Sequence, residues 1–279
     1  MKPLRLLSAL IKDNEIISRI QNTLQHVEPL RETIKKEKLN LKKYRKGEND
    51  YTTNVDLAVE NYLCNLPFIK KDSVISEEKI KVFNRSKFTW LIDPIDGTIN
   101  GLIKSLIPYY VLITLTVRNK PVFAVIDDPE NQLTSIALPN KGVFRIAKTT
   151  IKFFSKCATT STDAGLINKN GAFFHINSGT IRKIKSLSFM QIIDEFRNGQ
   201  IRWFYYVFTG NKFFYAHDLY PCWALSTALK LKFFINETRN NITFDRDGVC
   251  YAKGKLVKTI LITKNPKYIG VAKKALSNC

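Results

Sequence analysis

A short run at residues 90–98, Trp-Leu-Ile-Asp-Pro-Ile-Asp-Gly-Thr, combines residue types that can bind a metal ion and a phosphate. Asp93 and Asp96 supply two carboxylates. The Ile95 carbonyl follows a proline, which has no N–H to continue a strand, so we expect this oxygen to lack a regular partner. Hard cations take oxygen ligands, and the start of a helix attracts anions. The run therefore suits a cation and a phosphate together, and a strand-to-helix turn with an aspartate cap is the alternative.

Two further acidic motifs precede this run. Residues 74–78 (Val-Ile-Ser-Glu-Glu) are a short apolar run that ends in paired acids, and residues 50–56 (Asp-Tyr-Thr-Thr-Asn-Val-Asp) place another carboxylate at an expected helix start. Taken in order, the three motifs resemble the inositol monophosphatase family of metal-dependent sugar phosphatases over residues 46–145. That family carries Asp-x-Val-Thr-x-x-Asp, Gly/Ser-Glu-Glu and Asp-Pro-Ile/Leu-Asp-Gly-Thr at similar intervals.

The resemblance implies a Mg²⁺ site that holds one to three ions. Its ligands would be Glu77, Asp93, the Ile95 carbonyl and Asp96, with Asp93 bridging two cations. Such cations neutralise a phosphate and lower the pKa of a bound water. Glu78 matches the family less clearly than Glu77, and two adjacent acids in a solvated loop are the alternative for both.

Catalytic and substrate-binding roles follow from the same resemblance. Glu77, Thr98 and Asp56 would be catalytic, with Thr98 orienting and deprotonating the attacking water and Glu77 behind it. Asp96, Gly97 and Thr98 would contact the substrate, the last two through N–H groups that bind a phosphate oxygen. For Asp56 the alternative is a helix N-cap.

Residue spacing predicts the elements that position these acids. Alternation of apolar and polar residues predicts a strand that ends at Asp93, and residues 73–76 predict a strand that delivers Glu77. A helix is expected to begin at Asp56. An apolar stripe over residues 16–34 predicts an amphipathic helix that is interrupted or kinked near Pro29.

More strands are expected after the central run. They are predicted at residues 109–117, 121–126 and 133–138. Asp127 and Asp128 are interpreted as a turn. Lys46 precedes the first acidic motif; in the family a lysine near this place lies beside the metals, and simple exposure is the alternative.

The resemblance breaks down in the second half of the chain. Val207–Gly210 aligns with a family segment, and a gapless continuation puts Ala224 where the family has a metal-binding aspartate. Asp218 could replace that ligand, with an exposed loop as the alternative. His217 falls where the family often has a substrate-contacting acid, and a surface or cap histidine is the alternative. The family's upstream substrate segment is not recognisable at residues 197–202.

Composition limits the class of protein. The chain has 279 residues, of which 44% are hydrophobic and 11% aromatic, as expected for a globular protein. No apolar run reaches the roughly 20 residues of a membrane span, and the apolar core of the first residues is short for a signal peptide. The five cysteines are scattered without a Cys-x-x-Cys pair, which favours a reduced, cytoplasmic protein.

The formal net charge of +20 leaves two interpretations open. A basic surface favours phosphate-rich partners. Lysines are nevertheless spread along the whole chain, so compositional drift explains the charge at least as well. A nucleic-acid partner is therefore an alternative and not the favoured reading.

Together these observations predict an α/β protein with the layered αβαβα sugar-phosphatase fold, an α+β half at residues 1–147 and an α/β half at 148–279. The expected function is Mg²⁺-dependent hydrolysis of a small phosphorylated substrate such as inositol monophosphate, by a homodimer with an impaired second metal site. One alternative is a 3′(2′),5′-bisphosphate nucleotidase. Another is a catalytically weakened family member that binds RNA or the transcription machinery.

Overall fold

A computed structural model of the chain describes residues 7, 9–47, 50–105, 109–147, 150–154, 164–167, 173–177, 180–184, 190–191, 205–206, 214–230, 232–235, 238–239, 242–257 and 260–263. The chain divides into two compact units. The first comprises Met1–Ala137 and Phe144–Phe153, and the second comprises Leu138–Val143 and Phe154–Cys279. The expected division at residues 147 and 148 stays a prediction.

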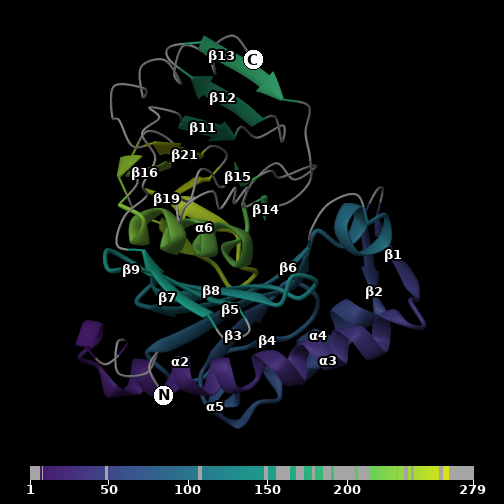
Figure 1. Cartoon of the computed structure of the whole chain (residues 1–279). Coiled ribbons are helices and arrows are strands. Elements are labelled where there is room, and N and C mark those ends of the chain that lie inside the picture. The colour runs from purple at the N-terminus through teal and green to yellow at the C-terminus, as the bar shows by residue number, and fades with distance from the viewer. Residues whose placement is uncertain are drawn as a thin grey trace. The chain divides into compact units, whose positions relative to one another are not determined.

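The first unit is built on an eight-stranded sheet in the order β10-β9-β8-β7-β6-β5-β3-β4 (Figure 1). Its strands are β3 (Ser73–Ser76), β4 (Lys81–Val82), β5 (Phe88–Asp96), β6 (Tyr110–Val117), β7 (Lys120–Asp128), β8 (Leu133–Leu138), β9 (Gly142–Ala147) and β10 (Thr150–Phe154). β3 and β5 are parallel, whereas β3–β4, β5–β6, β6–β7 and β7–β8 are antiparallel. The strands expected near residues 109–117, 121–126 and 133–138 are confirmed as β6, β7 and β8.

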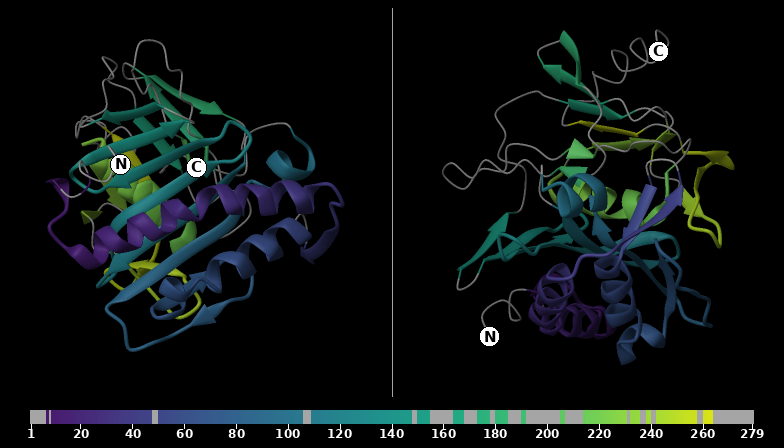
Figure 2. Two further views of the ribbon diagram at one scale, coloured as in Figure 1. Left: turned by 60° about the horizontal axis from the view of Figure 1, so that its bottom comes forward. Right: turned by 90° about the vertical axis from the view of Figure 1, so that its right-hand side faces the viewer.

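Helices cover one face of this sheet, as the left view of Figure 2 shows. They are α2 (Asn14–Gln25), α3 (Val27–Lys38), α4 (Asn54–Cys64) and the single turn α5 (Pro67–Lys70). Each long helix buries apolar residues at three- or four-residue spacing, as Val55, Val59 and Leu63 do on α4. A separate hairpin of β1 (Lys43–Gly47) and β2 (Asp50–Thr53) leads into α4.

The interruption or kink expected near Pro29 is a break at His26. This residue ends α2 and precedes α3, and its N–H bonds to the Thr23 carbonyl at 3.1 Å. Pro29 lies in the first turn of α3, where the backbone N–H groups have no partner within the helix. The proline is therefore compatible with the helix, and the prediction placed the break three residues too late.

A buried ion pair joins α3 to the sheet. Arg31 donates to Asp127 through Nε at 3.0 Å and through Nη2 at 2.6 Å, and Nη2 also donates to Thr134 at 2.9 Å. Asp127 is 1% exposed and Asp128 8%, both at the end of β7. The interpretation of these acids as a turn is wrong, because they are the last two residues of β7. A bidentate arginine from a distant helix compensates the buried charge of Asp127, and Asp128 accepts hydrogen bonds from Asn131 at 3.1 and 2.8 Å.

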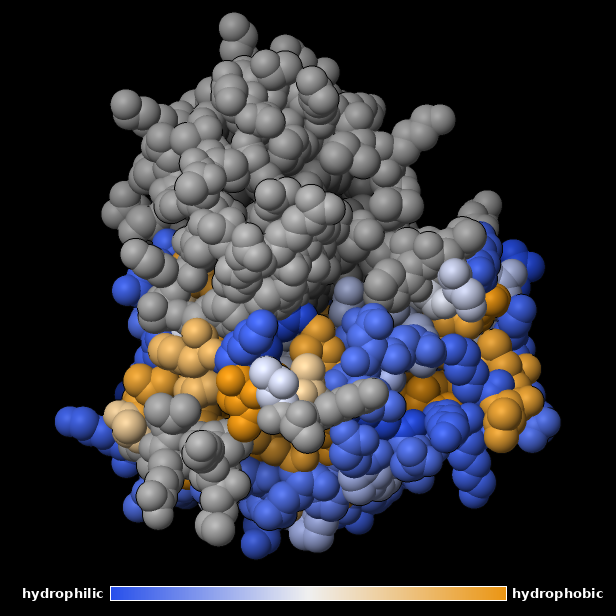
Figure 3. Space-filling view, in the orientation of Figure 1, coloured by the Kyte–Doolittle hydropathy of each residue, from blue (hydrophilic) through white to orange (hydrophobic). Residues whose placement is uncertain are grey.

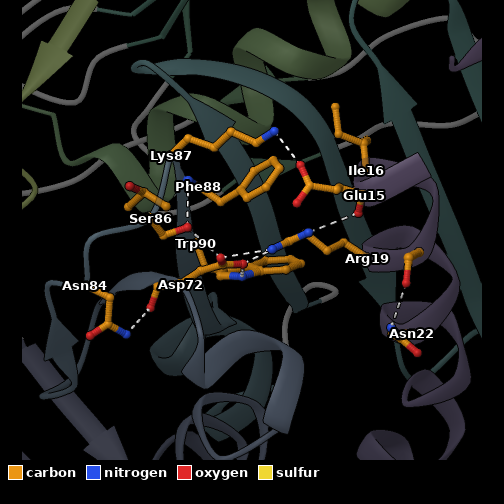
Figure 4. Close-up of polar contacts among 12 residues, drawn as sticks. Glu15, Ile16, Arg19, Asn22, Asp72, Asn84, Ser86, Lys87, Phe88 and Trp90 are labelled. Carbon is orange, nitrogen blue, oxygen red and sulfur yellow. Dashed lines mark hydrogen bonds and ion pairs between the residues drawn. The ribbon is translucent and has the colours of Figure 1, made fainter. Parts of the chain in front are cut away.

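A second buried carboxylate, Asp72, joins α2 to the strands that carry the acidic motifs (Figure 4). Arg19 donates to it through Nε at 2.8 Å and Nη2 at 3.0 Å, and the Trp90 indole N–H donates at 3.0 Å. The Ser86 hydroxyl donates at 2.7 Å. Asp72 directly precedes β3 and Trp90 lies on β5, so this network fixes the start of the parallel pair.

The described residues of the second unit form several small sheets and one long helix. A six-stranded sheet has the order β13-β12-β11-β21-β16-β17, and α6 (Ala216–Ala228) packs its Tyr220 against Trp223 and Phe244. The six strands are β11 (Ala164–Ile167), β12 (Phe173–Asn177), β13 (Thr180–Ile184), β16 (Lys232–Ile235), β17 (Thr238–Arg239) and β21 (Ile260–Thr263). The smaller sheets pair β14 (Met190–Gln191) with β15 (Tyr205–Tyr206), and β18 (Ile242–Phe244), β19 (Cys250–Ala252) and β20 (Lys255–Leu256). No helix in the described part of the chain is long and apolar enough to cross a membrane.

Candidate functional site

Glu77 directly follows β3, and Asp93 lies on the neighbouring parallel strand β5. β3 and β5 pair with Ser76 opposite Ile92, and the Glu77 N–H donates to the Ile92 carbonyl at 3.0 Å. This bond belongs to the Ser76–Ile92 pair, which is the last pair of the parallel ladder. Glu77 and Asp93 directly follow the two residues of this pair, on neighbouring chain segments about 4.8 Å apart. The backbones of the two acids therefore lie side by side where β3 ends.

A β-bulge places Asp96 on the same face as Asp93. Asp93 pairs with Leu112 and Asp96 pairs with Tyr110, so three steps along β5 match two steps along β6. Leu112 and Tyr110 are two residues apart and share a face, and their partners therefore share one too. In a regular strand, residues three apart would point to opposite faces. Asp93 and Asp96 are 3% and 7% exposed.

The bulge also corrects the expected end of the strand at Asp93. β5 continues through Pro94 to Asp96 and keeps its pairing with β6. A proline lacks the N–H that a regular ladder needs, but it is tolerated at a bulge, where one residue is left out of the ladder. The proline marks the bulge and not the end of the strand.

Gly97 turns the chain from β5 into a six-residue π-helix, Thr98–Ile103. Its φ of 96° lies in the left-handed region that glycine adopts without a steric cost. The Thr98 hydroxyl lies 2.9 Å from the Ile95 carbonyl and 2.8 Å from Asp56 Oδ1. The hydroxyl has one hydrogen, so it donates to one of these two oxygens at a time. The expectation that the Ile95 carbonyl lacks a regular backbone partner stays a prediction.

Asp56 has both a structural and a site-facing oxygen. Its Oδ2 accepts the Thr53 N–H at 2.8 Å and also the Thr53 hydroxyl, and Thr53 Oγ1 in turn accepts the Asp56 N–H at 3.3 Å. This reciprocal capping box starts α4 at Asn54, with Thr53 as the N-cap. Asp56 is therefore the third residue of the helix and neither its first residue nor its cap. Its Oδ1 is left to accept the Thr98 hydroxyl.

Burial controls the charge of Asp56. The side chain is fully buried, and burial raises its pKa to about 6 against the opposing hydrogen bonds from Thr53 and Thr98. The negative charge of Glu77 adds to the rise. The acid behind the Thr98 hydroxyl is thus Asp56, in the place where we expected Glu77.

Lys46 on β1 pairs with both acids of the Glu-Glu motif. Its ammonium lies 2.8 Å from Glu78 Oε1 and 3.5 Å from Glu77 Oε1. The Glu78 side chain is only 2% exposed, and burial together with the Glu77 charge raises its pKa to about 7, against the effect of Lys46. The lysine is therefore not simply exposed, and the Glu-Glu motif is not a freely solvated loop.

The carboxylates of this region repel one another without forming a closed cage. Beside the larger effect of burial, the charge of Glu77 raises the pKa values of Asp56 and Glu78, and the charge of Asp56 adds to the rise at Glu78. Among the described residues, no three acidic, histidine or cysteine side chains are grouped so that they could hold a metal ion by themselves. Any cation here would therefore take some of its ligands from water or from a substrate.

Comparison with known proteins identifies the family. The model of the inositol monophosphatase family matches residues 11–174, which is more than half of the chain. The chain belongs to the inositol monophosphatase family. The match includes Asp56, Glu77 and the whole Asp93–Thr98 run, as the resemblance of the acidic motifs implied.

Individual relatives of this family member match over shorter stretches. It is 34% identical over 123 residues to the 3′(2′),5′-bisphosphate nucleotidase CysQ of Haemophilus influenzae, covering 41% of this chain and 44% of that protein. It is 36% identical over 90 residues to the Nus factor SuhB of Escherichia coli (strain K12), covering 30% of this chain and 33% of that protein. The chain thus matches less than half the length of these curated relatives.

The fold prediction is confirmed by a solved structure. A dual IMPase/NADP phosphatase complexed with Mg²⁺ and phosphate matches with a TM-score of 0.55 and 16% identity, over 92% of this chain and 94% of that chain. The mixed α/β architecture with its large sheet is the fold of inositol monophosphatase family proteins. At this identity the likeness establishes the fold alone.

Two expectations for the second half of this family member need correction. Asp218 and His217 are 6% and 5% exposed, so neither lies on an exposed loop or at the surface. They form the first turn of α6, where an acid interacts favourably with the positive end of the helix dipole. Ala224 is fully buried on the same helix. Asp218 as a replacement ligand stays a prediction, and Val207–Gly210 and residues 197–202 lie wholly or largely outside the described part of the chain.

Two features of the site were missed in the sequence. The bulge that aligns Asp93 with Asp96 was signalled only by Pro94 between two strand-like stretches. The second is Glu60, whose carboxylate accepts hydrogen bonds from the loop after Glu77. Its signal is the spacing of four residues from Asp56, which puts both acids on one side of α4.

Proposed function

We propose that this chain is a Mg²⁺-dependent phosphomonoesterase that hydrolyses a sugar phosphate such as inositol monophosphate. The observation that supports the proposal is the strand pairing: the bulge in β5 turns Asp93 and Asp96 to one face, and Glu77 directly follows the last pair of β3 with β5. Thr98 follows two residues later, with its hydroxyl bound by Asp56. Membership of a family that contains phosphatases supports it.

The donor set suits Mg²⁺. This ion takes oxygen ligands, keeps several waters and is held by one or two carboxylates together with substrate phosphates. Glu77, Asp93, the Ile95 carbonyl and Asp96 would hold one to three such ions. Like-charge repulsion that raises the pKa values of Asp56 and Glu78 would be relieved by a cation. Mg²⁺ would supply neutralisation of the phosphate charge and a lower pKa for the attacking water.

Thr98 and Asp56 are arranged to move a proton. The Thr98 hydroxyl donates to Asp56 Oδ1, so its oxygen can accept a proton from a water molecule while its own proton passes to Asp56. Asp56 must be ionised to receive that proton, and a pKa of about 6 leaves it largely ionised at neutral pH. Glu77 raises this pKa and so makes Asp56 a better base.

The turn after β5 is proposed to contact the phosphate. Asp96, Gly97 and Thr98 follow one another there, and Gly97 has no side chain to keep a ligand from the backbone. The π-helix that follows has only six residues, so the contact depends on this turn and not on a long helix dipole.

A nucleotide bisphosphate is the second candidate substrate. It is favoured by the 34% identical match to CysQ, which is named a 3′(2′),5′-bisphosphate nucleotidase. The formal net charge of +20 would also speed encounter with a substrate that carries two phosphates.

A weakened member that binds RNA is the third candidate, motivated by Ala224 in place of the family aspartate and by the match to a Nus factor. The first four residues of β1, Lys43–Lys46, are largely exposed and three of them are basic. On the face shown in Figure 3, hydrophilic areas of the described residues lie beside hydrophobic patches. Affinity for RNA that does not fall with added salt would count against this reading.

Phosphate release by the purified full chain tests the proposal. The substrates are inositol 1-phosphate and adenosine 3′,5′-bisphosphate, each with Mg²⁺ and with EDTA. We expect Mg²⁺-dependent release that Asp93→Asn abolishes. Asp128→Asn, at a similarly buried acid of the same sheet outside the site, is the matched control. Absence of turnover with both substrates, in Mg²⁺ and in Mn²⁺, would refute the proposal and favour the binding protein.

A further inference from the structure

The loop after β3 carries Glu77 and Glu78 and is tied to α4 by one buried carboxylate. The N–H groups of Lys79 and Ile80 both donate to Glu60 Oε1, at 2.9 and 3.0 Å. Glu60 is 3% exposed. Hydrogen bonds to an ionised acceptor are roughly twice as strong as neutral ones. The loop is therefore held by its backbone and not only by its side chains.

The ends of the same loop are fixed by the sheet. The Ser76 N–H donates to the Ile80 carbonyl at 2.9 Å, and the Glu77 N–H donates to the Ile92 carbonyl at 3.0 Å. The segment between these bonds has no ladder of its own, and the bonds to Glu60 restrain it from the helix side. The position of Glu77 thus depends on β5 at one end and on α4 at the other.

Glu60 and Asp56 make α4 a common support for two acid-bearing segments. They are four residues apart on one helix and so lie on the same side of it. Asp56 binds the hydroxyl of Thr98, which follows the acids of β5, while Glu60 binds the loop that follows β3. A single rigid element therefore sets how far apart these two segments lie.

We propose that Glu60 is a positioning residue for the Mg²⁺ site. It holds the loop backbone so that Glu77 stays beside Asp93, and it does so without touching the metal or the substrate. The inference rests on the proposed function only in that Glu77 is a metal ligand. Residues that orient metal ligands in this way commonly change metal affinity by about 10- to 100-fold when they are replaced.

Two substitutions separate hydrogen bonding from simple packing. Glu60→Gln keeps the length of the side chain and an oxygen that can accept both N–H groups. Glu60→Met has a similar size and no such acceptor. Thr134→Val is the control, because it removes a hydroxyl from the buried Arg31–Asp127 pair, away from the loop. If Glu60→Met fails to fold, Glu60→Asp shortens the side chain and takes its place.

The first readout is direct binding of Mn²⁺, measured by electron paramagnetic resonance without substrate. We expect Glu60→Met to weaken binding by about 10- to 100-fold, Glu60→Asp to weaken it less, and Glu60→Gln and Thr134→Val to stay near the wild-type value. The second readout is hydrogen exchange in a peptide that covers Lys79 and Ile80. These amides should exchange faster than in the wild type in Glu60→Met. In Glu60→Gln and in Thr134→Val they should exchange at the wild-type rate.

Two results would overturn the inference. One is wild-type Mn²⁺ affinity with protected amides in Glu60→Met, or in Glu60→Asp where that replaces it. The other is loss of affinity in Glu60→Gln as large as in Glu60→Met, which would point to charge and not to the loop bonds. A wild-type protein that binds no Mn²⁺ and releases no phosphate would refute the proposed function instead. The exchange data would then still decide whether Glu60 holds the loop.

Discussion

Replacing Asp72 by asparagine should lower the free energy of unfolding by about 3 kcal/mol, as expected when one partner of a buried ion pair is removed. The carboxylate is 1% exposed and accepts hydrogen bonds from Arg19, Ser86 and the Trp90 indole (Figure 4). Asparagine keeps the shape but turns one acceptor oxygen into an NH₂ donor that faces other donors. It also leaves the Arg19 charge uncompensated.

The magnitude is taken at the lower end of the range because Arg19 retains some access to water. Its side chain is 16% exposed, and its guanidinium also stacks 3.8 Å above the Phe88 ring, a contact that the substitution leaves in place. Glu15→Gln is the matched control, because Glu15 lies on α2 together with Arg19 and also forms an ion pair. The side chains of Glu15 and Lys87 are both more than half exposed, so water screens their attraction and its loss should cost little stability.

Urea unfolding followed by tryptophan fluorescence and by far-ultraviolet circular dichroism measures both variants. The double substitution of Asp72→Asn with Arg19→Met should cost less than the sum of the two single changes, because each single change leaves its partner unpaired. A cost for Asp72→Asn no greater than for Glu15→Gln would refute the reasoning. So would strict additivity in the double variant, since it would mean that Arg19 and Asp72 do not stabilise each other.

Three further changes test the site. Thr98→Val should lower turnover by about 10²- to 10⁴-fold with little change in melting temperature, because it removes the hydroxyl that Asp56 binds. Thr98→Ser keeps a hydroxyl and should retain most of the wild-type turnover. Equal turnover in Thr98→Val and the wild type would contradict this role. Gly97→Ala should destabilise by about 1–2 kcal/mol in urea unfolding, because the φ of 96° is unfavourable for any residue with a Cβ, and an unchanged midpoint would contradict the strain. The pKa values of Asp56 and Glu78, about 6 and about 7, are raised chiefly by burial, so the folded protein binds these protons more tightly than the unfolded chain. In EDTA the free energy of unfolding should therefore fall as the pH rises from about 5 to about 7. Glu78→Gln should fall less steeply with pH, because it lacks one of the two acids. An equally steep fall in that variant would contradict the raised pKa of Glu78.

The sequence by itself determined the elements and the family. The alternation of apolar and polar residues around Trp90 and the β-branched run that became β6 predict strands because side-chain direction along a strand is a local property. The three acidic motifs identified the family before any geometry was known, because their residue types and order can be read directly from the chain. The acids Asp56, Glu77, Asp93 and Asp96 were found in this way.

Interpretation from sequence failed where the partner of a residue lies far away in the chain. Asp127 was read as a turn because adjacent acids before a proline are typical of one, and its bidentate partner Arg31 lies 96 residues earlier. Exposure stayed an alternative for Asp218 and His217 for the same reason, since polar residues reveal nothing about what packs over them. Burial of a charge depends on compensation, and compensation is a tertiary property.

Only the tertiary structure decided how the acids are combined. The spacing of three residues between Asp93 and Asp96 would put them on opposite faces of a regular strand, and it is the pairing with β6 through a bulge that turns them to one side. The backbone of Glu77 comes beside that of Asp93 because β3 and β5 run parallel up to the Ser76–Ile92 pair. Glu60 and Asp56 hold both segments because they share a helix face. Strand register and helix docking are set by contacts between residues distant in the chain, so motif spacing supplies the ligands and the fold supplies their geometry.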